Sequence, residues 1–201
     1  IQITKGAGSV INGYESISGQ INYEVLKPVN DIPFFLNVYG SQDSRYELNT
    51  HFNHKYSDKL STTLFLHGNT RQSRNDMNDD GFLDNPIGKQ VNILNRWQYN
   101  DAEKGWVSFL NLRYMNDEKQ AGEVGFNPDM DKLTTNAWGS EVNTEKIEIS
   151  NKTGYVFPEM PYQSFGFQNS FQSHKQESYF GLNQYNIHQT SFYSNLLFNS
   201  I

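Results

Sequence analysis

The sequence predicts an all-β fold, and three observations support this prediction. Apolar and polar residues alternate with a period of two along most of the chain, as in strands with one apolar and one polar face. The connections between these runs are short and long in turn. Aromatic residues make up 14% of the chain and stand at the ends of several runs. Together these features favour an antiparallel sheet.

Eight runs are expected to be strands. In the clearest one, from Arg45 to Tyr56, a face with aromatic ends alternates with a wholly polar face. The expected strands span residues 34–40, 45–56, 60–67, 91–99, 106–114, 146–157, 165–171 and 190–198. The short connections span 41–44, 57–59, 101–105 and 158–161, and the long ones about 69–90, 116–141 and 175–184.

The composition is poor in material for a thick apolar core. Only 36% of the 201 residues are hydrophobic, against roughly 45–50% in an average globular domain. No run approaches the ~18 apolar residues of a membrane helix, which excludes helical spans. A β-barrel is compatible with this composition, because its signal in sequence is alternation.

The pattern of connections predicts a transmembrane antiparallel β-barrel. Membrane barrels have tight turns at one end and long loops at the other, and strands of about ten residues cross their ~25 Å apolar band between aromatic girdles. The chain has this asymmetry and runs of this length. A soluble, secreted β-sandwich that binds carbohydrate or a protein partner is the alternative.

Charge and residue types exclude several other classes. The net charge of −6 argues against nucleic acid as a partner, which requires clustered Lys and Arg. The chain has no cysteine, so disulfides and thiolate metal sites are excluded. It has no initiating methionine or signal peptide, and we therefore expect a piece of a larger protein.

The opening stretch, residues 1–28, predicts a compact β unit. Two short β-branched runs flank a segment with four glycines that permit tight turns. Its fixed spacing consists of Lys5-Gly6, Ser9, Gly13, Gly19 and Ile21-Asn22. In this spacing the stretch resembles the end of the plug domain of TonB-dependent outer-membrane receptors, particularly those of the Bacteroidetes type.

The resemblance implies a fold and a function. Residues 1–28 would be the end of the plug, and residues 29–201 the first eight or so strands of a barrel of roughly twenty-two strands. It implies that the chain lies in outer-membrane lipid of a bacterium and takes up a bulky, scarce nutrient, most often a ferric siderophore. The inner-membrane TonB complex would drive this uptake through a contact region that is not in this chain. Glycan and cobalamin uptake by the same type of receptor stay open.

One loop motif predicts a calcium site. The segment Asp76–Asp84 matches the first nine positions of an EF-hand-type loop, with a sharp turn at Gly81. Ile87 stands where the bidentate glutamate is expected, so affinity would be weak. The same residues are typical of an ordinary surface turn, and both interpretations stay open. The predicted ligands are Asp76, Asn78, Asp80, the carbonyl of Phe82, and Asp84.

Aromatic residues in the long loops are the candidate ligand-binding residues, because loops bind while strands form the scaffold. Aromatic faces suit siderophore rings, corrins and sugars alike. The alternative for each is packing within its own loop. The candidates are Phe82, Phe126, Trp138, Tyr179 and Phe180.

Catalysis is not expected. The chain has no G-x-S-x-G element and no phosphate-loop spacing. His51 and His67 are expected on the polar faces of neighbouring strands, where solvated residues are a better interpretation than a metal site. No cofactor is expected to be required.

Overall fold

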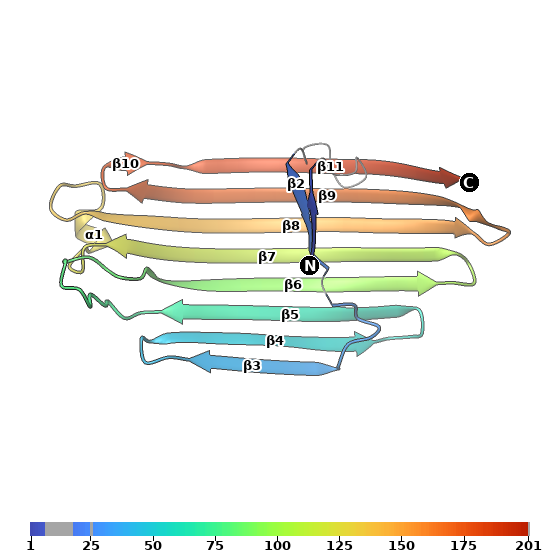
Figure 1. The fold of residues 1–201 in the computed structure, drawn as a ribbon, viewed down its shortest axis with the longest axis horizontal. Coiled ribbons are helices and arrows are strands. Elements are labelled where there is room, and N and C mark those ends of the chain that lie inside the picture. The colour runs from blue at the N-terminus through green and yellow to red at the C-terminus, as the bar shows by residue number, and fades with distance from the viewer. Residues whose placement is uncertain (7–17, 25, 201) are drawn as a thin grey trace.

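The computed structural model describes residues 1–6, 18–24 and 26–200. It consists of one large antiparallel sheet and a two-stranded hairpin that runs across it (Figure 1). The hairpin strands are β1 (Gln2–Lys5) and β2 (Gly19–Asn22). The sheet contains β3 (Phe34–Gly40), β4 (Arg45–Lys55), β5 (Leu60–Arg71), β6 (Ile87–Asp101), β7 (Trp106–Gly122), β8 (Gly139–Phe157), β9 (Met160–Phe180), β10 (Asn183–Gln184) and β11 (Ile187–Ser200), and one helical turn, α1 (Pro128–Asp131), lies outside it.

The sheet is a meander in which each strand from β3 to β9 pairs with the next one in the chain, and β11 returns to pair with β9. The eight expected strands are all present. The connections at one end are residues 56–59, 102–105 and 158–159, and those at the other include 72–86, 123–138 and 181–186. The predicted asymmetry of short turns and long loops is therefore confirmed.

The predicted boundaries of the long loops were wrong, because the strands extend further than the apolar pattern does. β7 continues to Gly122 and β8 begins at Gly139, inside the loop expected at 116–141. β5 and β6 likewise shorten the loop expected at 69–90 to residues 72–86. Residues 175–180, expected in a loop, belong to β9 and pair with β8. These strand ends are mostly polar, and the backbone ladder pairs them, together with side-chain interactions such as the bond from Tyr179 to Glu141.

The register divides the side chains into two faces. We call the face with Phe52, Leu64 and Ile149 the apolar face, and the face with His51, Arg113 and Glu148 the polar face. Across the apolar face the register aligns Phe34, Phe52, Leu64, Asn95, Leu112, Ile149, Phe171 and Phe192. Across the polar face it aligns Phe35, His51, Phe65, Leu94, Arg113, Glu148, Gln172 and Ser191.

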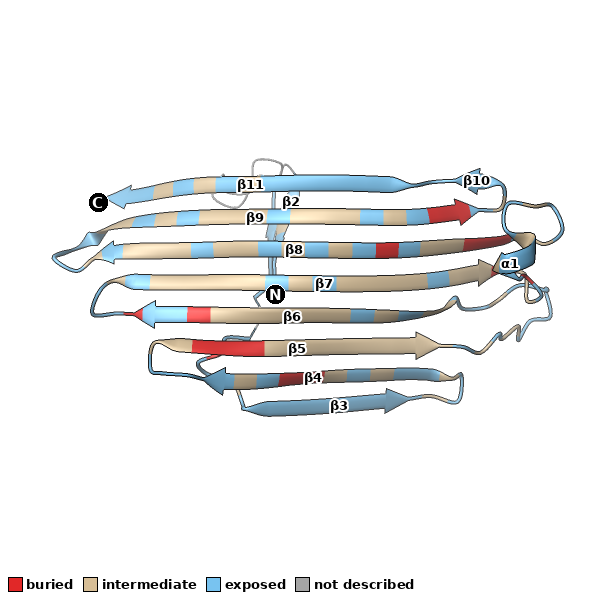
Figure 2. Ribbon diagram, turned by 180° about the vertical axis from the view of Figure 1, so that it is seen from behind, coloured by how far each residue is buried: buried red, intermediate tan, exposed pale blue. Residues whose placement is uncertain are grey.

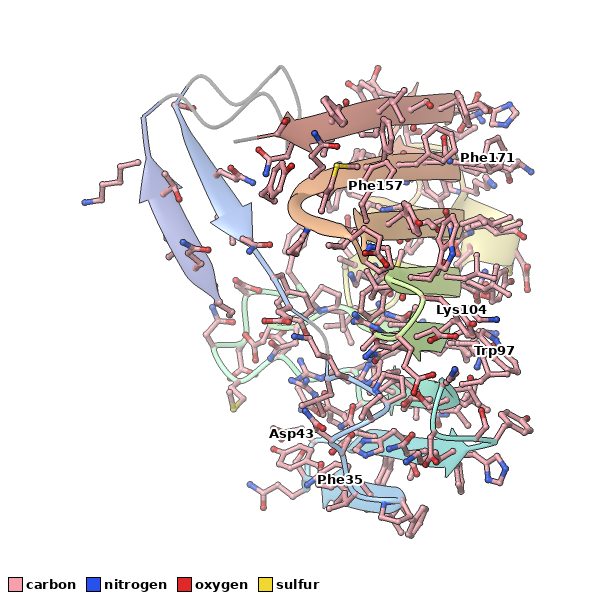
Figure 3. The ribbon with its side chains drawn as sticks, turned by 90° about the vertical axis from the view of Figure 1, so that its right-hand side faces the viewer. Phe35, Asp43, Trp97, Lys104, Phe157 and Phe171 are labelled. Atoms are coloured by element: carbon pink, nitrogen blue, oxygen red, sulfur yellow. The ribbon has the colours of Figure 1, made fainter. Side chains whose placement is uncertain are left out.

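The hairpin lies on the polar face, and the apolar face is uncovered in the described part of the chain. In Figure 3, Phe35 lies on the side of the hairpin, whereas Trp97 and Phe171 lie on the opposite side. Phe192 and Leu196 on the apolar face are 71% and 69% exposed. The chain exposes 13422 Å², whereas a globular protein of this size exposes roughly 9,700 Å². The excess is the surface of a single layer without a second layer to form a core.

Burial is concentrated in two places. Among the described residues, the buried large apolar side chains are those of Phe126 and Tyr179, at the long-loop end. The second place is the start of β5, where Ser61, Thr62 and Thr63 are buried (Figure 2). The molecule therefore has a small core at its loop end and a tightly covered patch near its connector.

β3 and β11 are the edges of the sheet, and the described residues do not pair them with each other. The sheet is thus open, and the predicted barrel closure stays a prediction. No helix among the described residues is long and apolar enough to cross a membrane.

The hairpin holds the described part of the plug-like motif. Lys5 pairs with Gly19, and Asn22 pairs with Gln2 at the other end. Gly6 has φ of +86°, which favours glycine. Ser9 and Gly13 lie outside the described residues. The division into residues 1–28 and 29–201 stays a prediction.

Candidate functional site

The two long loops dock on each other at one end of the sheet. An isolated β-bridge joins Phe82 to Glu123. The backbone N–H of Leu83 donates to the Gly122 carbonyl at 2.9 Å, and that of Val124 donates to the Gly81 carbonyl at 2.9 Å. Loops 72–86 and 123–138 therefore form one unit, which we call the loop pair.

Arg74 holds the loop pair together from within the first loop. Its Nη1 donates to the carbonyl oxygens of Val124 at 2.8 Å and Phe126 at 3.0 Å. A charged donor to two carbonyl oxygens makes a stronger tie than a neutral one. Nothing in the sequence around Arg74 singled it out, because its partners are backbone atoms about 50 residues away.

Phe126 and Tyr179 form the core beneath the loop pair. They are 1% and 3% exposed, with ring centroids 6.4 Å apart. A Cβ on Gly139 would lie 2.3 Å from the Phe126 ring, so the close packing requires glycine there. Neither ring can offer its face to a ligand in this conformation. For these two candidates the structure shows packing inside the protein, and Tyr179 belongs to β9 and not to a loop.

Tyr179 is further fixed by charged neighbours. Its hydroxyl donates to Glu141 Oε2 at 2.9 Å, and Lys132 Nζ lies 5.0 Å from its ring centroid. This end of β9 lies at the long-loop end of the sheet. Burial, with the bond to the Glu141 carboxylate, raises the pKa of the Tyr179 hydroxyl above its usual range, so the hydroxyl stays a donor at neutral pH.

The other three aromatic candidates are exposed and lie along one strip. Phe82, Trp138 and Phe180 are 43%, 45% and 44% exposed. The rings of Phe82 and Trp138 are 6.1 Å apart, and Phe180 and Tyr185 are 5.9 Å apart. The Trp138 indole lies close over Gly181, which connects the two pairs. Phe180 ends β9, so it too lies outside a loop, and Tyr185, just past the predicted loop, was missed.

The Asp76–Asp84 segment forms a turn held by its own side chains. The Asp76 carboxylate accepts from the backbone N–H groups of Asp80 at 3.1 Å and Gly81 at 2.8 Å. Asp84 accepts from the N–H of Met77 at 2.9 Å. Among the described residues, no group of three acidic, histidine or cysteine side chains is placed to hold a metal ion. The turn thus fits the surface-turn alternative, and calcium binding stays a prediction.

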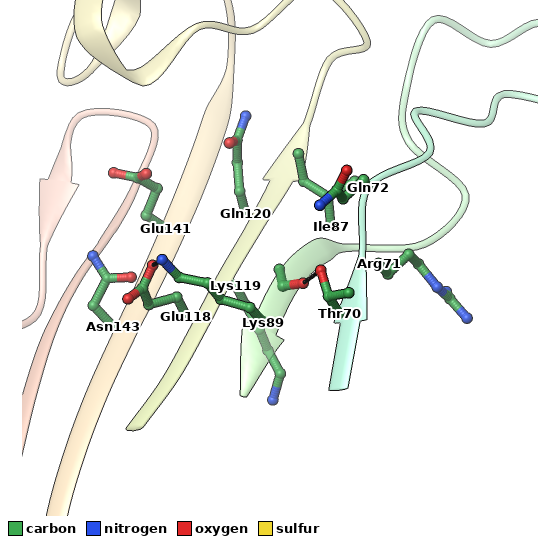
Figure 4. Close-up of a pocket in the computed structure, with 11 residues that line it drawn as sticks. Thr70, Arg71, Gln72, Ile87, Lys89, Glu118, Lys119, Gln120, Glu141 and Asn143 are labelled. Carbon is green, nitrogen blue, oxygen red and sulfur yellow. Dashed lines mark hydrogen bonds and ion pairs between the residues drawn. The ribbon is translucent and has the colours of Figure 1, made fainter. Parts of the chain in front are cut away.

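A shallow charged pocket of about 310 Å³ opens beside the loop pair (Figure 4). Lys89 and Glu118 form an ion pair of 3.1 Å in it, and the Thr70 hydroxyl donates to the Gly88 carbonyl at 3.3 Å. Lys119 and Glu141 add charges of both signs. Because the pocket carries charges of both signs, it favours neither an anionic nor a cationic ligand.

A larger cavity of about 570 Å³ separates the segment after the hairpin from the polar face. His51 and His67 both line it, as expected for neighbouring strands. His67 Nδ1 lies 2.6 Å from Asn49 Oδ1, and its Nε2 lies 2.9 Å from Asn69 Nδ2. Amide partners hold this imidazole, and no carboxylate or thiolate completes a metal site among the described residues.

No protein-family model, curated protein or solved structure matches this chain.

We predict that Arg74→Ala loosens the loop pair. The change removes two charge-assisted hydrogen bonds, so trypsin cleavage after the exposed Lys132 is expected to become about tenfold faster. Arg71→Ala is the matched control, because its side chain makes no hydrogen bond or ion pair with the described residues. Equal cleavage rates in the two variants would contradict this role of Arg74.

The calcium prediction has its own test. Chymotrypsin cleavage after Phe82 is expected to slow when roughly millimolar calcium is added, since weak loops of this type bind in that range. Asp76→Asn is expected to abolish the protection, whereas Asp58→Asn, in a turn at the other end of the sheet, is expected to keep it. Cleavage that does not respond to calcium would leave the segment an ordinary turn.

Proposed function

We propose that the chain forms the end of the plug and part of the wall of a TonB-dependent outer-membrane transporter. One observation supports this most directly. The hairpin and connector lie on the side of the polar face, while the apolar face, with Phe192 at 71% exposure, is left bare. In a water-soluble protein the covering segment would bury the apolar face instead. Lipid is the solvent that suits the bare face, and a polar lumen is the space that suits the covered one.

An aromatic row at the short-turn end supports the proposal. Tyr56 stacks on Trp97 with centroids 5.7 Å apart, and Trp106 contacts Tyr155 at 4.6 Å. Further pairs continue the row across the last strands. Rings with one polar edge are enriched where a bilayer meets water. The row would therefore mark the periplasmic boundary of the membrane.

Several polar groups on the apolar face are hydrogen-bonded to their neighbours. Asn95 Nδ2 donates to Thr62 Oγ1 at 3.1 Å, and the Thr62 hydroxyl donates to the Arg96 carbonyl at 3.0 Å. The hydroxyls of Ser108 and Thr153 are 2.8 Å apart. In hydrocarbon, where no water can replace a missing partner, such pairing is required.

The strands are long enough to place the loop end outside the membrane, where it could bind a ligand. β9 has 21 residues, whereas about ten cross the apolar band. The remainder lifts the loop pair and the aromatic strip above the expected membrane surface. We propose a ferric siderophore as the ligand. Glycan and cobalamin are alternatives, because the exposed aromatic rings at this end suit all three. These rings are those of Phe82, Trp138, Phe180 and Tyr185.

A soluble β-sandwich is the second candidate. It requires a second layer over the apolar face, and no described segment supplies one. A folded chain that stays monomeric without detergent, with its apolar face protected from quenchers, would favour this candidate.

We predict unequal losses of stability from arginine at two adjacent positions of β11. Phe192→Arg places a charge on the apolar face and is expected to lower the stability of the membrane-inserted protein by about 2–4 kcal/mol. Ser191→Arg places the same charge on the polar face and is expected to change it by less than about 1 kcal/mol. Urea unfolding in lipid vesicles measures both, and an equal cost at the two positions would contradict a lipid-facing sheet.

Uptake assays distinguish the ligand classes. Cells that make the intact protein are expected to accumulate a labelled ferric siderophore. This accumulation is expected to stop when the proton-motive force is collapsed. Labelled glycan and labelled cobalamin, offered in parallel, identify the alternatives. Uptake that persists without the proton-motive force would contradict TonB-driven transport.

A further inference from the structure

The connector between the hairpin and β3 is bonded to the sheet through Asn53 on β4. Its side-chain Nδ2 donates to the carbonyl oxygens of Pro28 at 2.6 Å and Asp31 at 3.1 Å. Its backbone N–H donates to the Pro33 carbonyl at 2.8 Å. From β5, the buried Thr63 hydroxyl donates to Asn53 Oδ1 at 3.3 Å and orients the amide. One asparagine thus holds both ends of the connector.

His51, two residues earlier on the same face of β4, makes a second tie. Its Nε2 lies 2.9 Å from Asp31 Oδ2, and the two side chains are only 7% and 13% exposed. The imidazole lies between Phe35, with centroids 5.4 Å apart, and Phe65, at 5.5 Å. Neither Nε2 nor Oδ2 has a hydrogen-bond partner among the described residues, so each polar atom has only the other. Loss of either would leave a buried polar atom without a partner.

The described residues just before Pro28 are exposed and make no hydrogen bond to the sheet. Glu24 and Lys27 pair with each other at 2.7 Å and are exposed, and Tyr23 is 69% exposed. Among the described residues, the hydrogen-bonded attachment to the sheet therefore begins at Pro28.

We propose that His51, Asp31 and Asn53 form a latch that fixes residues 28–33 to the sheet. The hairpin then moves relative to this latch, while residues 28–33 stay on the sheet. That this hairpin belongs to a plug which moves during transport rests on the proposed function. The latch itself does not, because its contacts lie within the described chain.

The test uses the absence of cysteine from the chain. Pro28→Cys introduces a single thiol at a buried position of the connector, and a water-soluble maleimide measures how often it opens. Adding His51→Gln or Asn53→Ala is expected to raise the alkylation rate of the folded, detergent-solubilised chain by about tenfold or more. A thiol introduced by Tyr23→Cys is expected to react rapidly in every background.

Two variants of β4 are matched controls. His54→Gln changes a histidine on the opposite face, whose ring contacts Tyr56 and not the connector. Asn49→Ala changes an asparagine on the same face that contacts His67. Both are expected to leave the alkylation rate within about twofold of the parent.

Each outcome decides the proposal. Unchanged alkylation with His51→Gln and Asn53→Ala, in protein whose circular dichroism is retained, would overturn the latch. Equal acceleration by His54→Gln would also overturn it, because the effect would then be general loosening. If His51→Gln does not fold, Asp31→Asn removes the same pair from the connector side and is judged by the same rates. Alkylation requires no transport, so failure of the latch and failure of the transport proposal are distinguishable.

Discussion

The backbone hydrogen-bond ladder between antiparallel neighbours is the interaction on which the structure depends. It runs from β3 to β11 and joins strands that have no apolar core between them apart from the small one at the loop end. Because side chains alternate along each strand, the register of this ladder also assigns every residue to one of two faces. A shift by one residue in any strand would exchange its Phe and Leu residues with its Asn and Lys residues. The two-faced character of the sheet is therefore a consequence of pairing.

Both faces of a one-layer sheet need a covering, and the two faces differ in what covers them. The polar face receives the hairpin and its connector, and there the buried His51 side chain pairs with Asp31. The apolar face receives no described segment, and several of its polar groups pair with one another. Such a face must be covered by something outside the described chain. Lipid is the covering that we propose, and it explains the aromatic row and the paired hydroxyls together.

The two ends of the sheet differ in construction. At the short-turn end, aromatic side chains lie side by side on the apolar face. At the other end, strands extend beyond the apolar pattern, and the loop pair closes over Phe126 and Tyr179. This small core gives the exposed rings of Phe82 and Trp138 a fixed base. A binding surface on such a base needs less ordering when a ligand arrives, which is the usual reason for placing binding residues on well-packed loops.

The sequence by itself determined the strands, their alternation and the asymmetry of the connections, because these follow from local patterns with a period of two. It did not determine where the strands end, since the outer parts of β7, β8 and β9 are mostly polar and are held by the neighbouring backbone and by side chains such as Tyr179. Only the tertiary structure decided that Phe126 is buried, because that depends on Gly139, which lies on another element. It alone placed His51 against Asp31, twenty residues apart, because no local pattern specifies a contact between a connector and a strand face.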